Sequence, residues 1–308
     1  MLSARTRFAG CGTSIVPAMA IRWDWLEPLL TVPYVPALGP AHPAAVTPAL
    51  FTDITGIAGT GRFLPHDKDA RWGGRKDEHI LTGAITQEPG LALIPVFSTR
   101  RQCVKVHLYS KQPRTALAEA AALARKLCEE HGAATGRIIW FLPPGSDPDP
   151  VAACTRIQMR IFSPGPPGPR AGPVPLDEVT AQVRATFSAF AEKMAGEGFA
   201  FLDARIREHG TGPVLTCQRD GTIAGAIGPM EIMPDSLGSA RLLSQYFGVL
   251  PEHRGLGLGR SLWRAAMRWG QQHHAAYQLL QTETGGASDR LCQSEGLTDL
   301  GLVCTSIL

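Results

Sequence analysis

The run Val249-Leu250-Pro251-Glu252-His253-Arg254-Gly255-Leu256-Gly257-Leu258-Gly259 decides the fold of the second half of this 308-residue chain. It connects an expected strand over 241–249 to an expected long helix over 259–274. The start of a helix carries free N–H donors and a partial positive charge, and both favour a bound phosphate. Glycines let the main chain approach a ligand closely, and Arg254 adds positive charge. The run therefore predicts a diphosphate-binding loop.

Three other interpretations of the glycines are weaker. A dinucleotide fingerprint requires G-x-G-x-x-G after a strand of a parallel unit, whereas Gly255, Gly257 and Gly259 give G-x-G-x-G. A P-loop ends in Gly-Lys-Ser/Thr, which Gly259-Arg260-Ser261 only approximates, and its first glycine is missing. A flexible loop without a ligand is the third interpretation.

The elements around the loop predict a mixed sheet with helices on its faces, an α/β fold. Asp177 is the expected N-cap of a helix over 177–192, and Asp220-Gly221 is the expected two-residue turn of a hairpin. The remaining elements are a helix over 199–209, hairpin strands over 213–219 and 222–232, a strand over 278–283, a helix over 288–295 and a strand over 300–305.

The first half repeats this order with less clarity. Strands are expected over 91–97, 103–109, 137–142 and 155–162, and an alanine-rich helix over 115–131. This recurrence indicates a degenerate duplicate of the second half. The segment Ser110–Arg114, which corresponds to the glycine loop, contains no glycine. The proline and glycine run Ser163–Pro173 predicts an extended linker, so we expect units over 1–162 and 176–308, joined by a linker over 163–175.

Composition excludes several protein classes. Hydrophobic residues make up 44% of the chain and charged residues 19%, which is typical of a packed globular protein. A net charge of +3 without a basic stripe argues against nucleic acid, and no apolar run is long enough for a membrane span. The 7 cysteines are widely spaced without a CxxC pair, so we expect no disulfide framework, no metal site and a cytoplasmic location. No apolar segment of signal-peptide length precedes Cys11.

The glycine loop resembles motif A of the GNAT superfamily of acyl-CoA-dependent N-acyltransferases, R/Q-x-x-G-x-G/A. Arg254, Gly257 and Gly259 match that motif. The hairpin with Ala224-Gly225 and the segment Leu291–Leu297 also resemble the family, the latter its L-Y-x-x-x-G-F. The resemblance implies a GNAT fold over 176–308 and a degenerate GNAT-like fold before it.

The resemblance also implies how acetyl-CoA or a longer acyl-CoA is bound, with no metal. The strand ending at Val249 separates from the strand over 278–283, and the pantetheine arm lies in the cleft between them beside Phe247 and Val249. The diphosphate meets the amides of the loop. The residues that the resemblance assigns to the co-substrate are Phe247, Val249, Arg254, Gly255, Leu256, Gly257, Leu258, Gly259 and Arg260.

The sequence departs from the family at the catalytic positions. Cys292 occupies the place of the usual tyrosine acid, either as a proton-donating thiol or as a small core residue. Leu243 stands where some members carry a glutamate, so Glu231 becomes the candidate base. Tyr246 is a second candidate acid or donor, or a packed aromatic residue.

The resulting hypothesis is an N-acyltransferase that moves an acyl group, most simply acetyl, to a primary amine of a small molecule. The two-unit form resembles actinobacterial antibiotic-pathway acyltransferases, including aminophosphonate N-acetyltransferases and glycopeptide-sugar N-acyltransferases. The alternatives are an enzyme that acts on acyl-carrier-protein thioesters, and a non-catalytic acyl-CoA-binding protein. The first unit is expected to wall in the acceptor, with Trp72 and Arg75 as candidates. The sequence does not determine the oligomeric state.

Overall fold

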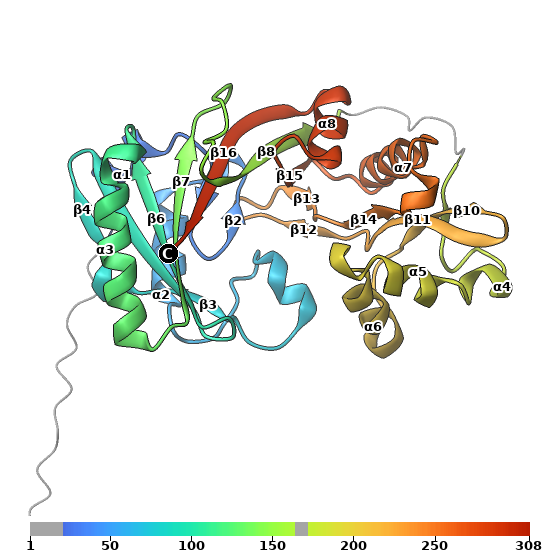
Figure 1. Cartoon of the computed structure of the whole chain (residues 1–308), viewed down its shortest axis with the longest axis horizontal. Coiled ribbons are helices and arrows are strands. Elements are labelled where there is room, and N and C mark those ends of the chain that lie inside the picture. Colours follow the sequence, from blue (N-terminus) through green and yellow to red (C-terminus); the bar gives the residue numbers. More distant parts are fainter. Residues whose placement is uncertain (1–20, 164–171) are drawn as a thin grey trace, which may run out of the picture.

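The computed structural model describes residues 21–163 and 172–308. Most of the expected linker, 164–171, lies outside the described residues, as does Cys11. Two halves lie next to each other along the long axis of the molecule, and β8 and β16 run between them (Figure 1). None of the helices in the described ranges has the length and apolarity that crossing a membrane requires.

The first half combines short elements with a sheet and one long helix. Its expected strands and helix are confirmed to within a few residues at each end: β5 Leu91–Ser98, β6 Cys103–Ser110, α3 Pro113–His131, β7 Thr135–Leu142 and β8 Ala153–Ile161. The segment before them, where prolines and glycines obscure any periodic pattern, contains α1 Trp23–Leu26, η1 Glu27–Leu29, β1 Tyr34–Val35, β2 Gly39–Pro40, η2 Pro43–Ala45, α2 Pro48–Gly56, η3 Lys68–Trp72, β3 Glu78–Ile80, η4 Thr82–Ala84 and β4 Thr86–Glu88.

The second half has its elements in the expected order. They are β9 Val174–Pro175, α4 Ala181–Arg184, α5 Phe187–Lys193, η5 Ala195–Glu197, α6 Phe199–His209, β10 Leu215–Arg219, β11 Thr222–Gly228, β12 Ile232–Pro234, β13 Ala240–Leu242, β14 Tyr246–Val249, η6 Pro251–His253, α7 Leu258–Gln272, β15 Tyr277–Glu283, α8 Ala287–Ser294 and β16 Thr298–Ile307. Asp220 and Gly221 both have positive φ, 50° and 73°, which confirms the tight hairpin turn.

The expected helix over 177–192 is wrong in two respects. It is two helices, α4 and α5, and its N-cap is Thr180, not Asp177. The hydroxyl of Thr180 accepts the amide of Val183 at 3.4 Å. Thr186 lies at the break, where its hydroxyl accepts the amide of Ile223 at 3.0 Å and so ties the chain to β11. A hydroxyl that bonds a neighbouring strand competes with continuation of the helix.

Two expected strands are also interrupted, and this divides the sheet. The strand over 222–232 breaks after Gly228, where Pro229 has no N–H for a ladder bond. The strand over 241–249 breaks at 243–245. One piece of each strand belongs to a four-stranded sheet ordered β14-β11-β10-β9, and the other piece to the large sheet ordered β12-β13-β15-β8-β16-β7-β6-β5-β3, with β4 beside β5.

The large sheet joins the halves by exchanging their last strands. β8, from the first half of the sequence, pairs antiparallel with β15 over Thr155–Ile161. β16, the last strand of the chain, pairs antiparallel with β7 of the first half. β8 and β16 also pair with each other, so the two expected units share one sheet (Figure 1).

The same pairing order occurs in both halves, but only the second opens. β6 and β7 are parallel neighbours joined by α3, and they remain paired over Cys103–Leu108. β13 and β15 are the corresponding parallel neighbours, and their pairing is confined to Arg241–Leu242. Beyond that point β14 pairs with β11, and a cleft separates it from β15. The order of pairings therefore supports a repeated fold whose second copy alone has a cleft.

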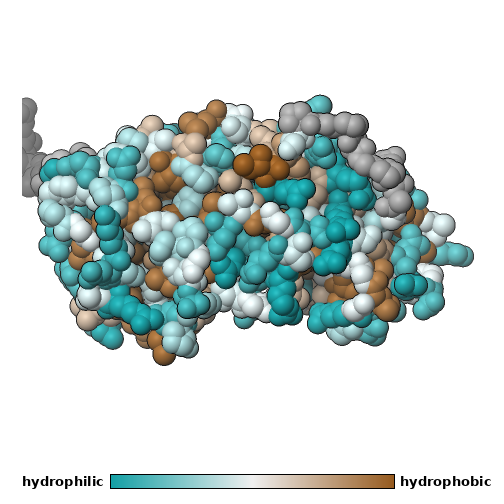
Figure 2. Space-filling view, turned by 90° about the horizontal axis from the view of Figure 1, so that it is seen from above, coloured by the Kyte–Doolittle hydropathy of each residue, from teal (hydrophilic) through white to brown (hydrophobic). Residues whose placement is uncertain are grey.

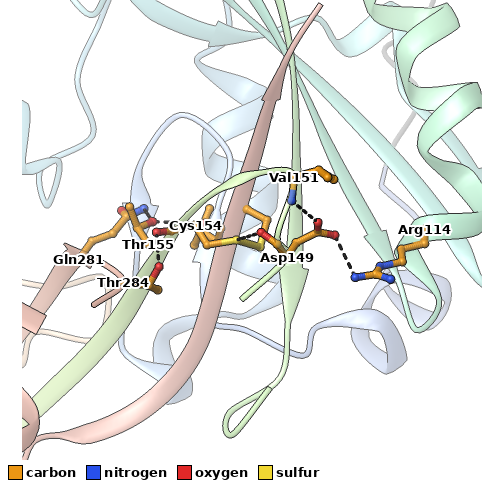
Figure 3. Close-up of a disulfide and its surroundings, with 9 residues drawn as sticks. Arg114, Asp149, Val151, Cys154, Thr155, Gln281 and Thr284 are labelled. Atoms are coloured by element: carbon orange, nitrogen blue, oxygen red, sulfur yellow. Dashed lines mark hydrogen bonds and ion pairs between the residues drawn. A yellow bond between two sulfur atoms is a disulfide. The ribbon is translucent and has the colours of Figure 1, made fainter. Parts of the chain in front are cut away.

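A disulfide lies where the exchanged strands meet. Cys154 in β8 and Cys304 in β16 are directly opposite each other and form a disulfide, with 4.2 Å between their Cα atoms (Figure 3). The expectation of no disulfide framework did not anticipate this pair, because pairing across strands brings together residues 150 positions apart. Disulfides are rare in cytosolic proteins. Cysteine spacing consequently no longer supports a cytoplasmic location. Cys103, Cys128, Cys217 and Cys292 are free.

Candidate active site

The cleft begins where two parallel strands part. Arg241 and Leu242 of β13 pair with Tyr277 and Gln278 of β15, and the Ser244 hydroxyl still reaches the Leu279 carbonyl at 3.4 Å. The chain then turns away as β14, which is an edge strand of the small sheet. The main chain of β14 therefore has one edge open to the cleft.

The main-chain groups on the open edge are those of Phe247 and Val249, the two residues expected to lie beside the pantetheine arm. The amide of Leu250 donates to the Ala224 carbonyl at 2.9 Å. Antiparallel residues alternate between those that bond the partner strand and those that point away from it. Gly248 and Tyr246 therefore bond β11, and the main-chain groups of Phe247 and Val249 point into the cleft. Such groups suit the amides of an extended ligand.

The glycine loop has the geometry of a phosphate cradle. Gly255 and Gly257 have φ of 80° and 78°, which favours glycine, and Gly257 is the N-cap of α7. The space next to the Cα of each is open. The first N–H groups of α7 face out of the helix without a carbonyl partner in it. The Arg254 side chain turns back, and its Nε donates to the Val249 carbonyl at 3.1 Å.

Four arginines lie around one side of this loop. Arg260 and Arg264 pair with Glu295 at 3.1 Å and 2.9 Å, and together with Arg268 and Arg290 they line a cavity of about 780 Å³ that also contains the three loop glycines. Figure 2 shows mainly hydrophilic residues over α7 and α8 on this face. The field here is positive and suits a polyphosphate.

Two further cavities meet within the cleft. The outer cavity, about 590 Å³, extends from the glycine loop along β14, and the inner cavity, about 310 Å³, extends from Tyr246 towards the first half. Residues common to both linings mark the junction between them. They are Glu197, Phe247, Gln281, Thr282, Ser288 and Leu291. A molecule in the outer cavity meets a molecule in the inner cavity at this junction.

Cys292 lies on the inner side of the junction. It lines the inner cavity and is 2% exposed. Burial, and then the carboxylate of Asp289, raise the pKa of its thiol to about 11. The thiol therefore stays protonated at neutral pH and belongs to the same buried cluster as Trp263 and Leu262.

The other two candidate catalytic residues have different settings. Tyr246 lines the inner cavity, packs near Phe201 and Trp72, and has a pKa raised by burial. Glu231 is not among the residues that line either cavity. Its carboxylate pairs with Arg71 at 3.1 Å, and Arg71 also donates to the Ser244 carbonyl. This arrangement gives Glu231 a contact between the halves.

Sequence reasoning missed Glu197 and Ser288, both at the junction. Glu197 ends the 3₁₀ turn η5, and Gly198 follows with φ of 84°. A Cβ on Gly198 would lie 2.4 Å from the Tyr246 ring, so glycine permits the close contact that places Glu197 beside β14. Ser288 lies one helical turn before Cys292, on the same face of α8. The only sequence signal for it is this spacing from the expected acid position.

The exchanged strand β8 holds α8 in place. Asp289, 1% exposed, accepts from Gln158 at 2.9 Å and pairs with Arg156 at 3.2 Å, and both partners lie in β8. Its second oxygen accepts the amide of Gly285 at 2.9 Å. The helix that carries Ser288 and Cys292 is thus positioned by a strand from the first half.

The first half also walls the inner cavity. Pro40 and Lys68 belong to its lining. Trp72 packs edge-on against Phe201 at 5.2 Å, next to Tyr246, whereas Arg75 donates to Thr60 and lies apart from the cavity. Neither of the two residues expected in this wall lines the inner cavity, although Trp72 packs against Tyr246, which does.

Comparison with known proteins identifies the second half. The family model described as the acetyltransferase (GNAT) family matches residues 179–292. Residues 179–292 therefore form a GNAT domain. The matched range contains the glycine loop and both strands, β14 and β15, that border the cleft. A comparison with curated proteins found no match.

Solved structures with partial likeness include other GNAT proteins. A GCN5-related N-acetyltransferase from Sphaerobacter thermophilus is 16% identical, with 72% of this chain and 81% of that chain covered and a TM-score of 0.43. A tandem GNAT protein from the clavulanic acid biosynthesis pathway is 15% identical, with 84% and 94% covered and a TM-score of 0.45. A GCN5-related N-acetyltransferase from Kribbella flavida is 14% identical, with 72% and 88% covered and a TM-score of 0.41.

Proposed function

We propose that the protein transfers an acyl group from acyl-CoA to a primary amine of a small molecule. The observation that carries the proposal is the junction, where the outer cavity next to the glycine loop meets the inner cavity bounded by both halves. CoA occupies the outer cavity, with its diphosphate on the amides of residues 255–260. The acceptor occupies the inner cavity. The two substrates then meet without a covalent enzyme intermediate.

The residues at the junction suit this reaction. The Glu197 carboxylate takes a proton from the acceptor ammonium, and the free amine attacks the thioester carbon. The new C–N bond forms as the C–S bond breaks, and the Ser288 hydroxyl relays the second amine proton to the departing thiolate. The open edge of β14 at Phe247 supplies main-chain donors near the carbonyl.

The size of the inner cavity supports a short acyl group. Its volume of about 310 Å³ must hold both the acceptor and the acyl group. Ligand cavities usually span about 300–1,000 Å³, so this one is small. Acetyl is therefore the favoured donor. The resemblance to antibiotic-pathway acyltransferases supports an acceptor from natural-product biosynthesis.

The substitution Glu197→Gln tests the proposal. We expect amine-dependent release of CoA thiol from acetyl-CoA in the native chain, and a kcat about 100-fold lower in the variant. The KM for acetyl-CoA should not change, because the diphosphate site is elsewhere. Glu192→Gln is the control, since Glu192 is exposed on α5 outside both cavities. Tight CoA binding with no thiol release for any amine would contradict the enzymatic role and favour a non-catalytic acyl-CoA-binding protein.

The arginine-lined cavity gives one reason to test a second donor. A basic surface at the mouth of the cleft is what an acidic acyl-carrier protein would contact. Acetyl-CoA and an acetylated carrier protein should therefore be compared at equal concentration. Turnover with the acetylated carrier protein and none with acetyl-CoA would show that the carrier protein, and not CoA, is the donor.

A further inference from the structure

The charges lining the inner cavity are separated along its length. Glu197 lies at the junction with the outer cavity. Lys68 and Arg241 line the inner cavity but not the outer one, and both also line a small adjoining cavity of about 20 Å³. Arg241 is on β13, at the closed end of the cleft where β13 still pairs with β15. The cavity thus has an acid at the junction and two cations away from it.

Arg241 has unused hydrogen-bonding capacity. Its Nη2 donates to the His66 carbonyl at 3.1 Å, and its Nε is buried without a hydrogen-bond partner. Over residues 21–163 and 172–308, no carboxylate lies within 4.0 Å of it. Arg71, by contrast, pairs with Glu231. The bond to His66 uses one of the five N–H donors of the guanidinium, so Arg241 retains donors for an anionic ligand in the inner cavity.

The neighbouring acids are already engaged. Asp235 accepts from the amides of Leu237 and Ser239 and from the Tyr277 hydroxyl at 2.8 Å. Asp67 pairs with Lys76 at 2.7 Å. These two carboxylates stabilise the fold near Arg241 without an ion pair to it.

Lys68 reinforces the positive end of the cavity. Its Nζ donates to Asp69 at 2.8 Å, and its side chain remains 35% exposed. An ammonium has three donors, so this bond leaves capacity for a ligand. Among the charged residues of the lining, Lys68 and Arg241 outnumber Glu197. A simple cationic amine fits this balance poorly.

We propose that the acceptor is a small zwitterion, a primary amine that also carries an anionic group such as a carboxylate or phosphonate. The inference rests on the proposed function. The ammonium lies beside Glu197, and the anion lies between Arg241 and Lys68. Glu197 lies beside Tyr246, because the preceding turn packs on that ring through Gly198. The five residue steps from Arg241 to Tyr246 span at most about 17 Å of extended chain. The inner cavity, about 310 Å³, has room for a molecule of amino-acid size between these two ends.

Matched acceptors test the charge requirement. Initial rates with acetyl-CoA are measured for linear ω-amino acids of increasing length, their uncharged primary amides, and the aminoalkyl phosphonates of the same lengths. We expect a kcat/KM about 10- to 100-fold higher for the anionic acceptors than for the amides at the best length. The carboxylate and phosphonate arms show which anion is preferred.

Two variants locate the anion site. Arg241→Gln and Lys68→Gln should each reduce this preference about 10-fold or more, measured as the ratio of kcat/KM for the anionic acceptor to kcat/KM for its amide. Arg75→Gln is the matched control, because Arg75 lies outside the cavity. Equal or faster turnover of the amides in the native chain would overturn the inference while leaving the proposed function intact. Thiol release with none of the amines would instead remove the proposed function and this inference together.

Discussion

Gly257 must adopt a positive φ and must also leave room for the diphosphate, and a pair of substitutions can separate these two requirements. Its φ of 78° favours glycine, and its position at the N-cap of α7 places it against the expected diphosphate. A side chain in this backbone region costs about 1–2 kcal/mol, and asparagine and aspartate tolerate it better than other residues. The neighbouring space is open, so neither substitution meets a steric clash.

Gly257→Asp and Gly257→Asn therefore differ mainly in charge. We expect Gly257→Asp to reduce acetyl-CoA affinity about 100-fold or more through repulsion of the diphosphate, and Gly257→Asn to reduce it much less. Titration calorimetry measures the affinities, and thermal unfolding should give similar midpoints for the two variants. Equal affinity in the two variants would mean that the diphosphate binds elsewhere.

A residue of the site could be predicted from the sequence only where its signal lies within a few neighbouring positions. The glycine loop was recognisable because backbone freedom and a helix start are encoded within a few positions. Glu197 was not, because it lies in a 3₁₀ turn and reaches the cleft only through the packing of Gly198 on Tyr246. Cys292 was found by alignment with a family motif, and its burial shows why position alone does not establish an acid.

At the scale of elements, the sequence predicted the type and order of most helices and strands. It did not predict which strands pair with each other. A segment such as 155–161, in which apolar and polar residues are mixed, indicates a strand, and nothing in it specifies which strand lies beside it. The exchange of β8 and β16 therefore had no local signal. The same applies to the Cys154–Cys304 pair, which depends on the register between those strands. The break in the strand over 222–232, by contrast, has a visible cause in Pro229.

The disulfide between β8 and β16 should stabilise the fold measurably. Closing a loop across 150 residues removes unfolded-state entropy worth up to about 5 kcal/mol. We expect a reductant to lower the urea midpoint of the native chain. A Cys154→Ala/Cys304→Ala double variant should have the lower midpoint with or without reductant. Insensitivity of the native chain to reductant, together with peptide mapping that finds both thiols free, would contradict the crosslink.

At the scale of the molecule, the two halves depend on each other. The strand β8 supplies the neighbour of β15 and holds Asp289 through Arg156 and Gln158. The strand β16 supplies the neighbour of β7. Each half lacks an internal strand of its own sheet without the other, and an unpaired internal edge exposes both apolar surface and backbone donors. The proline-rich run was a visible boundary in the sequence, but it does not separate independent sheets.

Fragments cut at that run test this dependence. We expect residues 172–308 expressed alone to aggregate or remain unfolded, because β15 and α8 lose their contacts with β8. Coexpression with residues 21–163 should restore a soluble one-to-one complex that binds acetyl-CoA, since the exchanged strands can pair between two chains. Size-exclusion chromatography and circular dichroism measure assembly and folding. The full chain cleaved within 164–171 after folding is the control and should remain assembled. A folded, monomeric 172–308 fragment that binds acetyl-CoA with native affinity would show that the GNAT domain does not require its partner strand.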